Sequence, residues 1–187
     1  MEKLKQWNPS LNVEYGDIEH LPYSDNSLGT YISLGVVEHF EEGADKPLHE
    51  AYRILEPGGT LILTVPYNNI FRKFIAHPLR SVYLLFHRMR KGKISFAEYR
   101  YSKKEVREMI EKAGFQIIRT DIDDFVSNTS SLGLWSEFPL LQDRNSLYAL
   151  NKVGKAIAFI LNSVNKKFLA SGILIIAQKT LDENRIK

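Results

Sequence analysis

Short apolar runs separated by polar turns predict five β-strands along the chain. Two of them, residues 28–37 and 60–66, are apolar at successive positions, which is typical of parallel strands buried on both faces. The other three are β-rich runs bounded by turn residues, and they cover residues 11–16, 115–122 and 172–179.

Apolar residues at steps of three and four predict helices between these strands. One helix follows residue 46, and we expect Pro57-Gly58-Gly59 to end it in a tight turn. Ser102, followed three residues later by Glu105, is a capping box that begins another helix, which Gly114 ends. The longest expected helix covers 146–168, with an apolar stripe of Leu147, Leu150, Val153, Ile157, Leu161, Val164 and Phe168.

Strands that alternate with helices predict an α/β fold with a doubly wound, mostly parallel sheet. The 187 residues are enough for one domain with its own core, so we expect residues 1–187 to form a single domain. Two segments are longer than a strand–helix connection requires, and we expect helical insertions at 67–101 and 125–169. Because the second insertion separates the strand at 115–122 from the strand at 172–179, the length of the connection does not predict whether the last strand is parallel or antiparallel to the others.

Composition narrows the function classes. The chain has no cysteine, which excludes disulfides, thiolate metal sites and cysteine nucleophiles. It has neither a signal-like start nor an apolar run of the roughly 18 residues that span a bilayer. We therefore expect a cytoplasmic protein, or one that is peripheral to a membrane.

Positive charge is concentrated in residues 72–107. This window holds eleven Lys and Arg against two Glu, a local charge of +9 in a chain whose net charge is +3. Such a block suits an anionic partner such as phosphate, nucleic acid or a lipid headgroup, and it equally suits a solvated helix face. We do not expect nucleic acid as a partner, because the sequence contains no recognisable nucleic-acid-binding module.

Four stretches in order resemble the class I S-adenosylmethionine-dependent methyltransferases of the methyltransferase type 11 kind. They are GDIEHLPYSDNSL (16–28), ISLGVVEHF (32–40), EAYRILEPGGTLILTVP (50–66) and YSKKEVREMIEKAGFQIIRT (101–120). GILIIAQK (172–179) is similar to the closing strand of that family. The resemblance implies a Rossmann-like fold, a transferase activity and S-adenosylmethionine as cofactor.

The resemblance also implies cofactor-binding residues at the carboxyl ends of strands, where ligands bind in open α/β sheets. It assigns the Asp17 carboxylate to the adenine amino group and the Ile18 amide to a ring nitrogen. Leu34 and Gly35 would lie beneath the methionine part of the cofactor. A Gly-Asp pair can also form a turn through the aspartate side chain, and this alternative stays open for Asp17.

Glu38-His39 follows the second of these strand ends. The resemblance places His39 near the site of methyl transfer, where it could act as a general base; a structural role, such as capping a helix, is the alternative. Some related O-methyltransferases hold a divalent metal with an ExxEH arrangement. Gly35 stands where its first Glu would be, so we predict no metal.

The resemblance is incomplete at the N-terminus. The family begins with a strand and a G-x-G-x-G turn, then a second strand whose terminal acidic residue binds the ribose, and neither precedes Gly16. We therefore expect an N-terminally truncated domain that binds S-adenosylmethionine weakly or not at all, with exposed sheet edges that favour oligomers. The alternative is a cofactor-free binding or scaffolding protein derived from the same fold.

Substrate specificity in this fold comes from insertions above the sheet. The two insertions are rich in aromatic residues, and the candidates for a substrate pocket are Tyr67, Asn68, Tyr99, Tyr101 and Trp135. Apolar, aromatic and basic residues mix in the 72–107 region, which suits a membrane surface. We therefore expect a small, amphiphilic or lipid-linked substrate.

Overall fold

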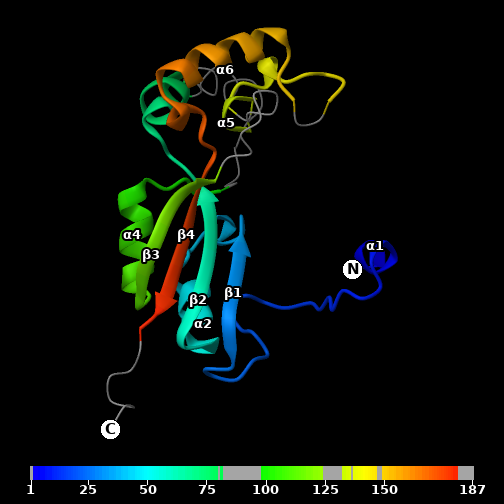
Figure 1. The fold of residues 1–187 in the computed structure, drawn as a ribbon, viewed down its shortest axis with the longest axis vertical. Helices are drawn as coiled ribbons and strands as arrows, with labels where there is room; N and C mark the ends of the chain where they lie inside the picture. Colours follow the sequence, from blue (N-terminus) through cyan, green and yellow to red (C-terminus); the bar gives the residue numbers. More distant parts are fainter. Residues whose placement is uncertain are drawn as a thin grey trace.

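A computed structural model describes residues 2–79, 81, 98–123, 132–135, 137–146 and 149–180. It shows a four-stranded sheet with a helical cap beyond one end (Figure 1). The strands follow the order β1-β2-β4-β3, and their bounds are β1 Leu28–Leu34, β2 Leu55–Pro66, β3 Phe115–Asp123 and β4 Gly172–Lys179.

The last strand runs against the other three. β1 pairs with β2 in parallel, whereas β4 is antiparallel to both β2 and β3. The start of β4 lies beside the end of β3, where Gly172 pairs with Asp123. The chain therefore leaves the sheet at the cap and returns from it at the same end, which forces β4 into the opposite direction.

Two helices cover one face of the sheet. They are α2 (Asp45–Ile54) and α4 (Lys103–Lys112), and α4 begins at the expected capping box of Ser102 and Glu105. Their apolar sides pack on alternate residues of the central strands, and the fully buried members of this core include Leu48, Ala51, Ile110, Leu61, Leu63, Ile173, Ile175 and Ala177. This alternation follows from the two-residue period of a strand.

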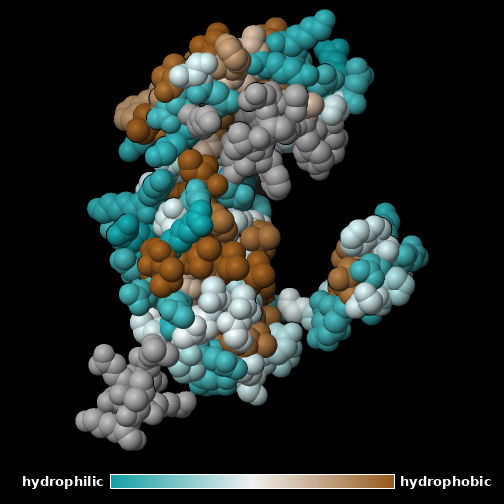
Figure 2. Space-filling view, viewed as in Figure 1, coloured by the Kyte–Doolittle hydropathy of each residue, from teal (hydrophilic) through white to brown (hydrophobic). Residues whose placement is uncertain are grey.

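The opposite face of the sheet is exposed. Ile32 and Leu34 of β1 and Ile118 of β3 are 58%, 59% and 59% exposed. Figure 2 shows apolar side chains gathered across the strands on this side. The expectation that β1 is buried on both faces is therefore wrong for the described residues, because α2 and α4 both pack on the other face.

Residues 11–16 do not form the predicted strand. They run as extended chain between α1 (Glu2–Trp7), which stands apart from the sheet in Figure 1, and the turn at Asp17. A β-rich run becomes a strand only when a neighbour completes its ladder of hydrogen bonds. β1 is the outermost described strand on this side of the sheet, and residues 11–16 do not pair with it.

Pro57-Gly58-Gly59 lies inside β2 rather than in a turn before it. Leu28 pairs with Leu55 and Thr30 pairs with Thr60, so four residues of β2 bulge out opposite Gly29. Gly58 has a φ of 80°, which L side chains rarely adopt. The glycines thus serve a bulge in the strand rather than the tight turn that the sequence predicted.

The cap has a core of its own. Its elements are η2 (Arg72–Ala76), α5 (Leu132–Trp135), η3 (Pro139–Leu141), α6 (Lys152–Val164) and η4 (Lys166–Leu169). They bury Phe71, Ala76, Leu134, Leu150, Ala158 and Leu169 together. α6 is shorter than predicted, and two residues of its expected apolar stripe, Val153 and Val164, are 61% and 71% exposed.

Lys179 ties the end of β4 to α2. Its buried Nζ donates to the backbone oxygens of Tyr52 and Leu55, at 2.7 and 2.8 Å, and to Asn26 Oδ1 at 2.8 Å. The ammonium also lies over the Tyr52 ring, 4.4 Å from its centroid. These contacts satisfy a charge that would otherwise be costly to bury.

Candidate active site

The carboxyl end of β1 is shaped by Gly35. Its φ of 66° turns the chain out of the strand and into η1 (Val37–His39), and its N–H donates to the Thr64 oxygen of β2 at 3.2 Å. A Cβ at this position would lie 3.5 Å from Glu38 Oε1. Glycine therefore permits the turn and keeps the space beside the Glu38 carboxylate open.

Glu38 carries the most unusual carboxylate of this region. Its side chain is 4% exposed, and its Oε2 is buried with no hydrogen-bond partner among the described residues. Burial raises the pKa of Glu38, an effect that Glu98 reinforces and that the Glu38 backbone N–H and His39 oppose. A buried carboxylate with an unused oxygen is well suited to accept a proton or a hydrogen bond from a bound molecule.

His39 lies beside this carboxylate, with its Nε2 3.9 Å from Glu38 Oε1. Its side chain is 55% exposed. The sequence pointed to His39 as the candidate base through the family resemblance. It gave no sign that the neighbouring Glu38 would be buried. The structure makes Glu38 the more enclosed of the two groups.

Four of the predicted pocket residues meet at the end of β2. Tyr67 and Tyr101 form a parallel bridge, and the Asn68 backbone N–H donates to the Tyr101 backbone oxygen at 2.8 Å. The Tyr99 backbone N–H donates to the Glu38 backbone oxygen at 2.9 Å, and the rings of Tyr99 and Tyr101 lie 6.1 Å apart. The tyrosines therefore sit against the turn that carries Glu38.

Two of these phenols are protonated at neutral pH, and burial moves their pKa further from neutrality. It raises the pKa of Tyr101 to about 12, with a smaller contribution from the negative charge of Glu38, and it also raises the pKa of Tyr67. Both hydroxyls are therefore hydrogen-bond donors at neutral pH. Trp135, the fifth predicted residue, instead packs against the core of the cap.

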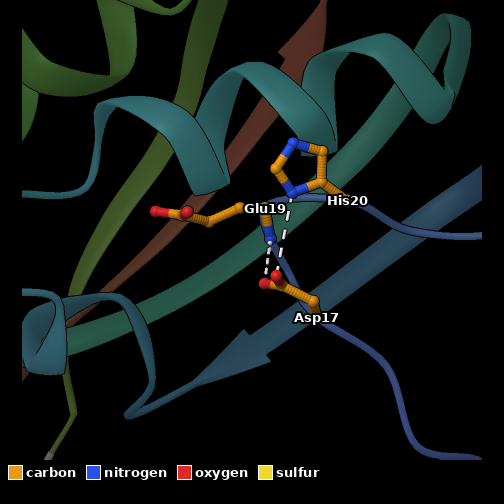
Figure 3. A group of neighbouring side chains, drawn as sticks. All are labelled: Asp17, Glu19 and His20. Carbon is orange, nitrogen blue, oxygen red and sulfur yellow. Dashed lines mark hydrogen bonds and ion pairs between the residues drawn. The ribbon is translucent and has the colours of Figure 1, made fainter.

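Asp17 forms a turn of its own (Figure 3). Its Oδ1 accepts the Glu19 N–H at 2.9 Å, its backbone oxygen accepts the His20 N–H at 2.9 Å, and its Oδ2 lies 3.7 Å from His20 Nδ1. This is the side-chain turn that the sequence left open as the alternative. The Asp17 side chain is still 62% exposed, so its carboxylate remains accessible to a ligand.

Neighbouring residues give this turn a fixed position and a hollow. Ile18 packs against the core of the sheet. A hollow of about 260 Å³ adjoins Gly16, and its lining includes Tyr15, Leu21 and Tyr23.

Glu50 and Arg53 of α2 clamp the segment that follows Asp17. Glu50 Oε1 accepts the Leu21 N–H at 2.7 Å, and Arg53 Nη1 donates to Asp25 Oδ1 at 2.6 Å. Arg53 also donates to both Glu50 oxygens, at 2.8 and 2.7 Å. These bonds to Arg53 hold the pKa of Glu50 at about 2.

Glu50→Gln is expected to lower the free energy of unfolding at pH 7 by about 2 kcal/mol, because a charge-assisted clamp is lost. Since the native pKa lies below the ordinary 4.5, the carboxylate contributes fully above pH 4.5 and its contribution falls as the pH approaches 2. Urea unfolding at several pH values measures this difference, with Glu56→Gln, at an exposed position of β2, as control. A difference that stayed constant from pH 7 to pH 2.5 would contradict the clamp.

The basic block does not form one surface. Arg72 is buried, and its Nε lies 3.2 Å from Glu137 Oε1. Its Nη1 donates to the backbone oxygens of Tyr67 and Ser171, at 2.6 and 2.9 Å. Arg100 also pairs with Glu137. Two of the eleven cations are therefore neutralised inside the protein, which a count along the sequence cannot reveal.

Other members of the block lie elsewhere. Lys103, Lys104 and Arg107 line a hollow of about 390 Å³ between α4 and the strands β3 and β4. Arg80, Arg88, Arg90, Lys91 and Lys93 lie outside the described residues. The described part of residues 72–107 therefore does not form a continuous basic surface.

The known proteins to which this sequence is similar are methyltransferases. Residues 1–63 match the model of a methyltransferase domain family. The chain is 28% identical over 109 residues to 2-methyl-6-phytyl-1,4-hydroquinone methyltransferase 1 of rice chloroplasts, a match that covers 58% of this chain and 28% of that one. It is 33% identical over 116 residues to the mitochondrial 2-methoxy-6-polyprenyl-1,4-benzoquinol methylase of Bos taurus, covering 54% and 33%.

The fold is likewise similar to solved structures. A S-adenosylmethionine-dependent methyltransferase from Methanosarcina mazei superimposes with a TM-score of 0.54 at 17% identity, over 96% of this chain and 76% of that one. The chain spans about a third of the length of the first curated relatives it matches. The expected α/β, Rossmann-like methyltransferase fold is confirmed.

Proposed function

We propose that this chain, a relative of the class I S-adenosylmethionine-dependent methyltransferases, serves the transfer of a methyl group to a small molecule. The observation that carries the proposal is the buried Glu38 carboxylate beside Gly35, at the strand end where this fold binds its ligands. The sequence match over residues 1–63 supports it.

The residues present fit the cofactor in part. Gly35 leaves room for a ligand at the end of β1, and the exposed Asp17 carboxylate can accept a hydrogen bond from an adenine amino group. When bound, S-adenosylmethionine supplies an electrophilic methyl group. The family's contacts to the ribose and the carboxypropyl end belong to segments that have no counterpart before Gly16 in this sequence.

Glu38 is the proton acceptor in this proposal. Its raised pKa brings it closer to neutrality, which suits a group that takes a proton from an acceptor hydroxyl. The protonated Tyr67 and Tyr101 hydroxyls can orient the acceptor, and His39 is the second candidate for the base. In-line methyl transfer otherwise depends on holding the two reactants in position.

The acceptor is inferred to be an amphiphilic phenol or hydroquinone. The names of the rice and bovine relatives describe hydroquinones that carry a phytyl or polyprenyl chain. The tyrosine cluster offers an aromatic surface for a ring, and the cap lies beyond it. A lipid-linked substrate would bring the protein to a membrane from the cytoplasm, with the 72–107 region as a proposed point of contact.

The outer edge of β1 is proposed as the place where further strands complete the sheet, either from the same protein or from a second copy. Titration calorimetry tests this together with the function. We expect residues 1–187 alone to bind S-adenosylmethionine weakly or not at all, and a fusion that supplies the first two strands and glycine-rich turn of a class I methyltransferase to bind it.

Two outcomes would contradict these statements separately. Micromolar affinity for residues 1–187 would refute the need for further strands. A folded fusion that binds no cofactor would refute the proposed function and favour a cofactor-free scaffolding protein. Asp17→Ala in the fusion is the matched variant, and it should weaken binding if the adenine lies at this turn.

A further inference from the structure

α6 exposes four of its large apolar residues. It buries Gly154 and Ala158 in the cap, and Ile157 and Leu161 pack partly buried against the same core. Val153, Phe159, Ile160 and Val164 are 61%, 71%, 62% and 71% exposed. A helix that served only to cover the cap would place its large side chains inward, so the outer face needs another explanation.

Three of these exposed residues share one side of the helix. Val153, Ile160 and Val164 are separated by seven and four residues, which places them nearly in line along α6, and Phe159 lies about 100° further round its exposed surface. The Ser163 hydroxyl on the same side donates to the Phe159 oxygen at 2.8 Å, so its polarity is partly satisfied within the helix. The result is an apolar strip about three turns long.

The helix that carries this strip, and the residues that follow it to residue 181, carry only positive charge. The sequence contains no Asp or Glu between Asp143 and Asp182. Lys152 and Lys155 are exposed on α6, and Lys167 is exposed just beyond its C-terminal end. A second copy packed on this face would bring like charges together, whereas an anionic surface would complement them.

We propose that the outer face of α6 binds the surface of an anionic phospholipid bilayer. The helix lies in the plane of the interface, with Phe159, Ile160 and Val164 among the acyl chains and the lysines at the headgroups. Among the described residues, no helix is both long and apolar enough to cross a membrane, so the contact is peripheral. This binding does not depend on the proposed methyl transfer.

Vesicle co-sedimentation tests the proposal with the chain as it stands. The protein should bind vesicles of phosphatidylcholine with about 30% phosphatidylglycerol at least ~10-fold more tightly than phosphatidylcholine alone, and 1 M salt should remove most of the difference. The double variant Phe159→Glu/Ile160→Glu should lose about 10-fold or more in affinity with an unchanged melting temperature. Ile118→Glu on β3 is the matched control, since Ile118 is 59% exposed but lies on the sheet.

Three results would overturn the proposal. The wild-type chain could fail to bind anionic vesicles. The double variant could bind as tightly as the control, which would move the contact to another surface. Light scattering could show a dimer that the double variant dissociates, which would make this face a site of self-association.

Discussion

Glu38→Gln is expected to raise the melting temperature at pH 7 while it lowers methyl transfer by about 10²- to 10⁴-fold, the range of general acid–base catalysis. Both effects have one cause. The carboxylate is buried and one of its oxygens has no partner among the described residues, so its ionised form is costly to the fold, and in the proposed mechanism that oxygen takes the proton of the substrate. The amide keeps the shape and removes the charge.

The pH dependence gives this prediction its sign. The native pKa of Glu38 lies above the ordinary 4.5, so the native protein loses stability relative to the unfolded chain as the pH rises above 4.5. Above the raised native pKa the loss is complete and constant. Glu38→Gln should therefore gain most at neutral pH, by about 1 kcal/mol or roughly 2 to 4 °C, and nothing at pH 4.

Calorimetric melting of the chain, and a methyl-transfer assay of the fusion described above with a prenylated hydroquinone, check the two parts. Glu41→Gln changes the charge equally at an exposed position three residues away and should leave both unchanged. His39→Gln separates the two candidate bases. The assignment fails if Glu38→Gln melts lower than wild type throughout, or if it keeps full activity while His39→Gln loses it.

Glu137→Leu is expected to have the largest effect on stability, a loss of about 3 to 5 kcal/mol. Glu137 is the carboxylate shared by Arg72 and Arg100, and its side chain is fully buried. Its removal leaves the Arg72 guanidinium, 4% exposed, without its acidic partner. Because Arg72 also donates to the Tyr67 and Ser171 oxygens, the loss should reach both the cap and the strand ends.

Urea unfolding measures this effect, and two variants interpret it. Glu98→Leu removes the other, more exposed partner of Arg100 and should cost less than about 1 kcal/mol. Arg72→Met combined with Glu137→Leu removes both buried charges and should recover much of the loss. Equal costs for Glu137→Leu and Glu98→Leu would show that the buried cluster is not a distinct source of stability.

Local signals in the sequence predicted local structure well. The capping box at Ser102 and the glycine at position 114 bounded α4 correctly, and the run from Gly172 to Lys179 is β4 as expected. Ser102 and Gly114 bound α4 through local backbone geometry: Ser102 accepts the Glu105 N–H, and Gly114 adopts a positive φ. Prediction of the methyltransferase fold needed the order of several such elements, and it is confirmed.

Errors arose where the outcome depends on a distant neighbour. Residues 11–16 have the composition of a strand, but pairing requires an adjacent strand. α6 is apolar on several sides, so its period identified a helix without identifying the side that packs. The expected basic surface included Arg72 and Arg100 because the sequence does not show that both pair with the buried Glu137.

The site residues stay predictions. Tyr67, Asn68, Tyr99 and Tyr101, chosen because the insertions are rich in aromatic residues, lie together, whereas Trp135 belongs to the cap. The enclosed state of Glu38 depends on the tertiary fold and could not be read from the Glu-His pair. The roles of Asp17, Ile18, Leu34 and Gly35 toward a cofactor remain predictions.

The place of β4 in the sheet has a consequence for synthesis on the ribosome. β4 is the last of the described strands, yet it lies between β2 and β3 and supplies the described sheet partner of β3. Until residue 179 has emerged, β1 and β2 can pair, but β3 has no ladder to join. The cap must therefore be translated before the sheet can close, and the half-sheet that waits exposes a strand edge to chaperones and to other nascent chains.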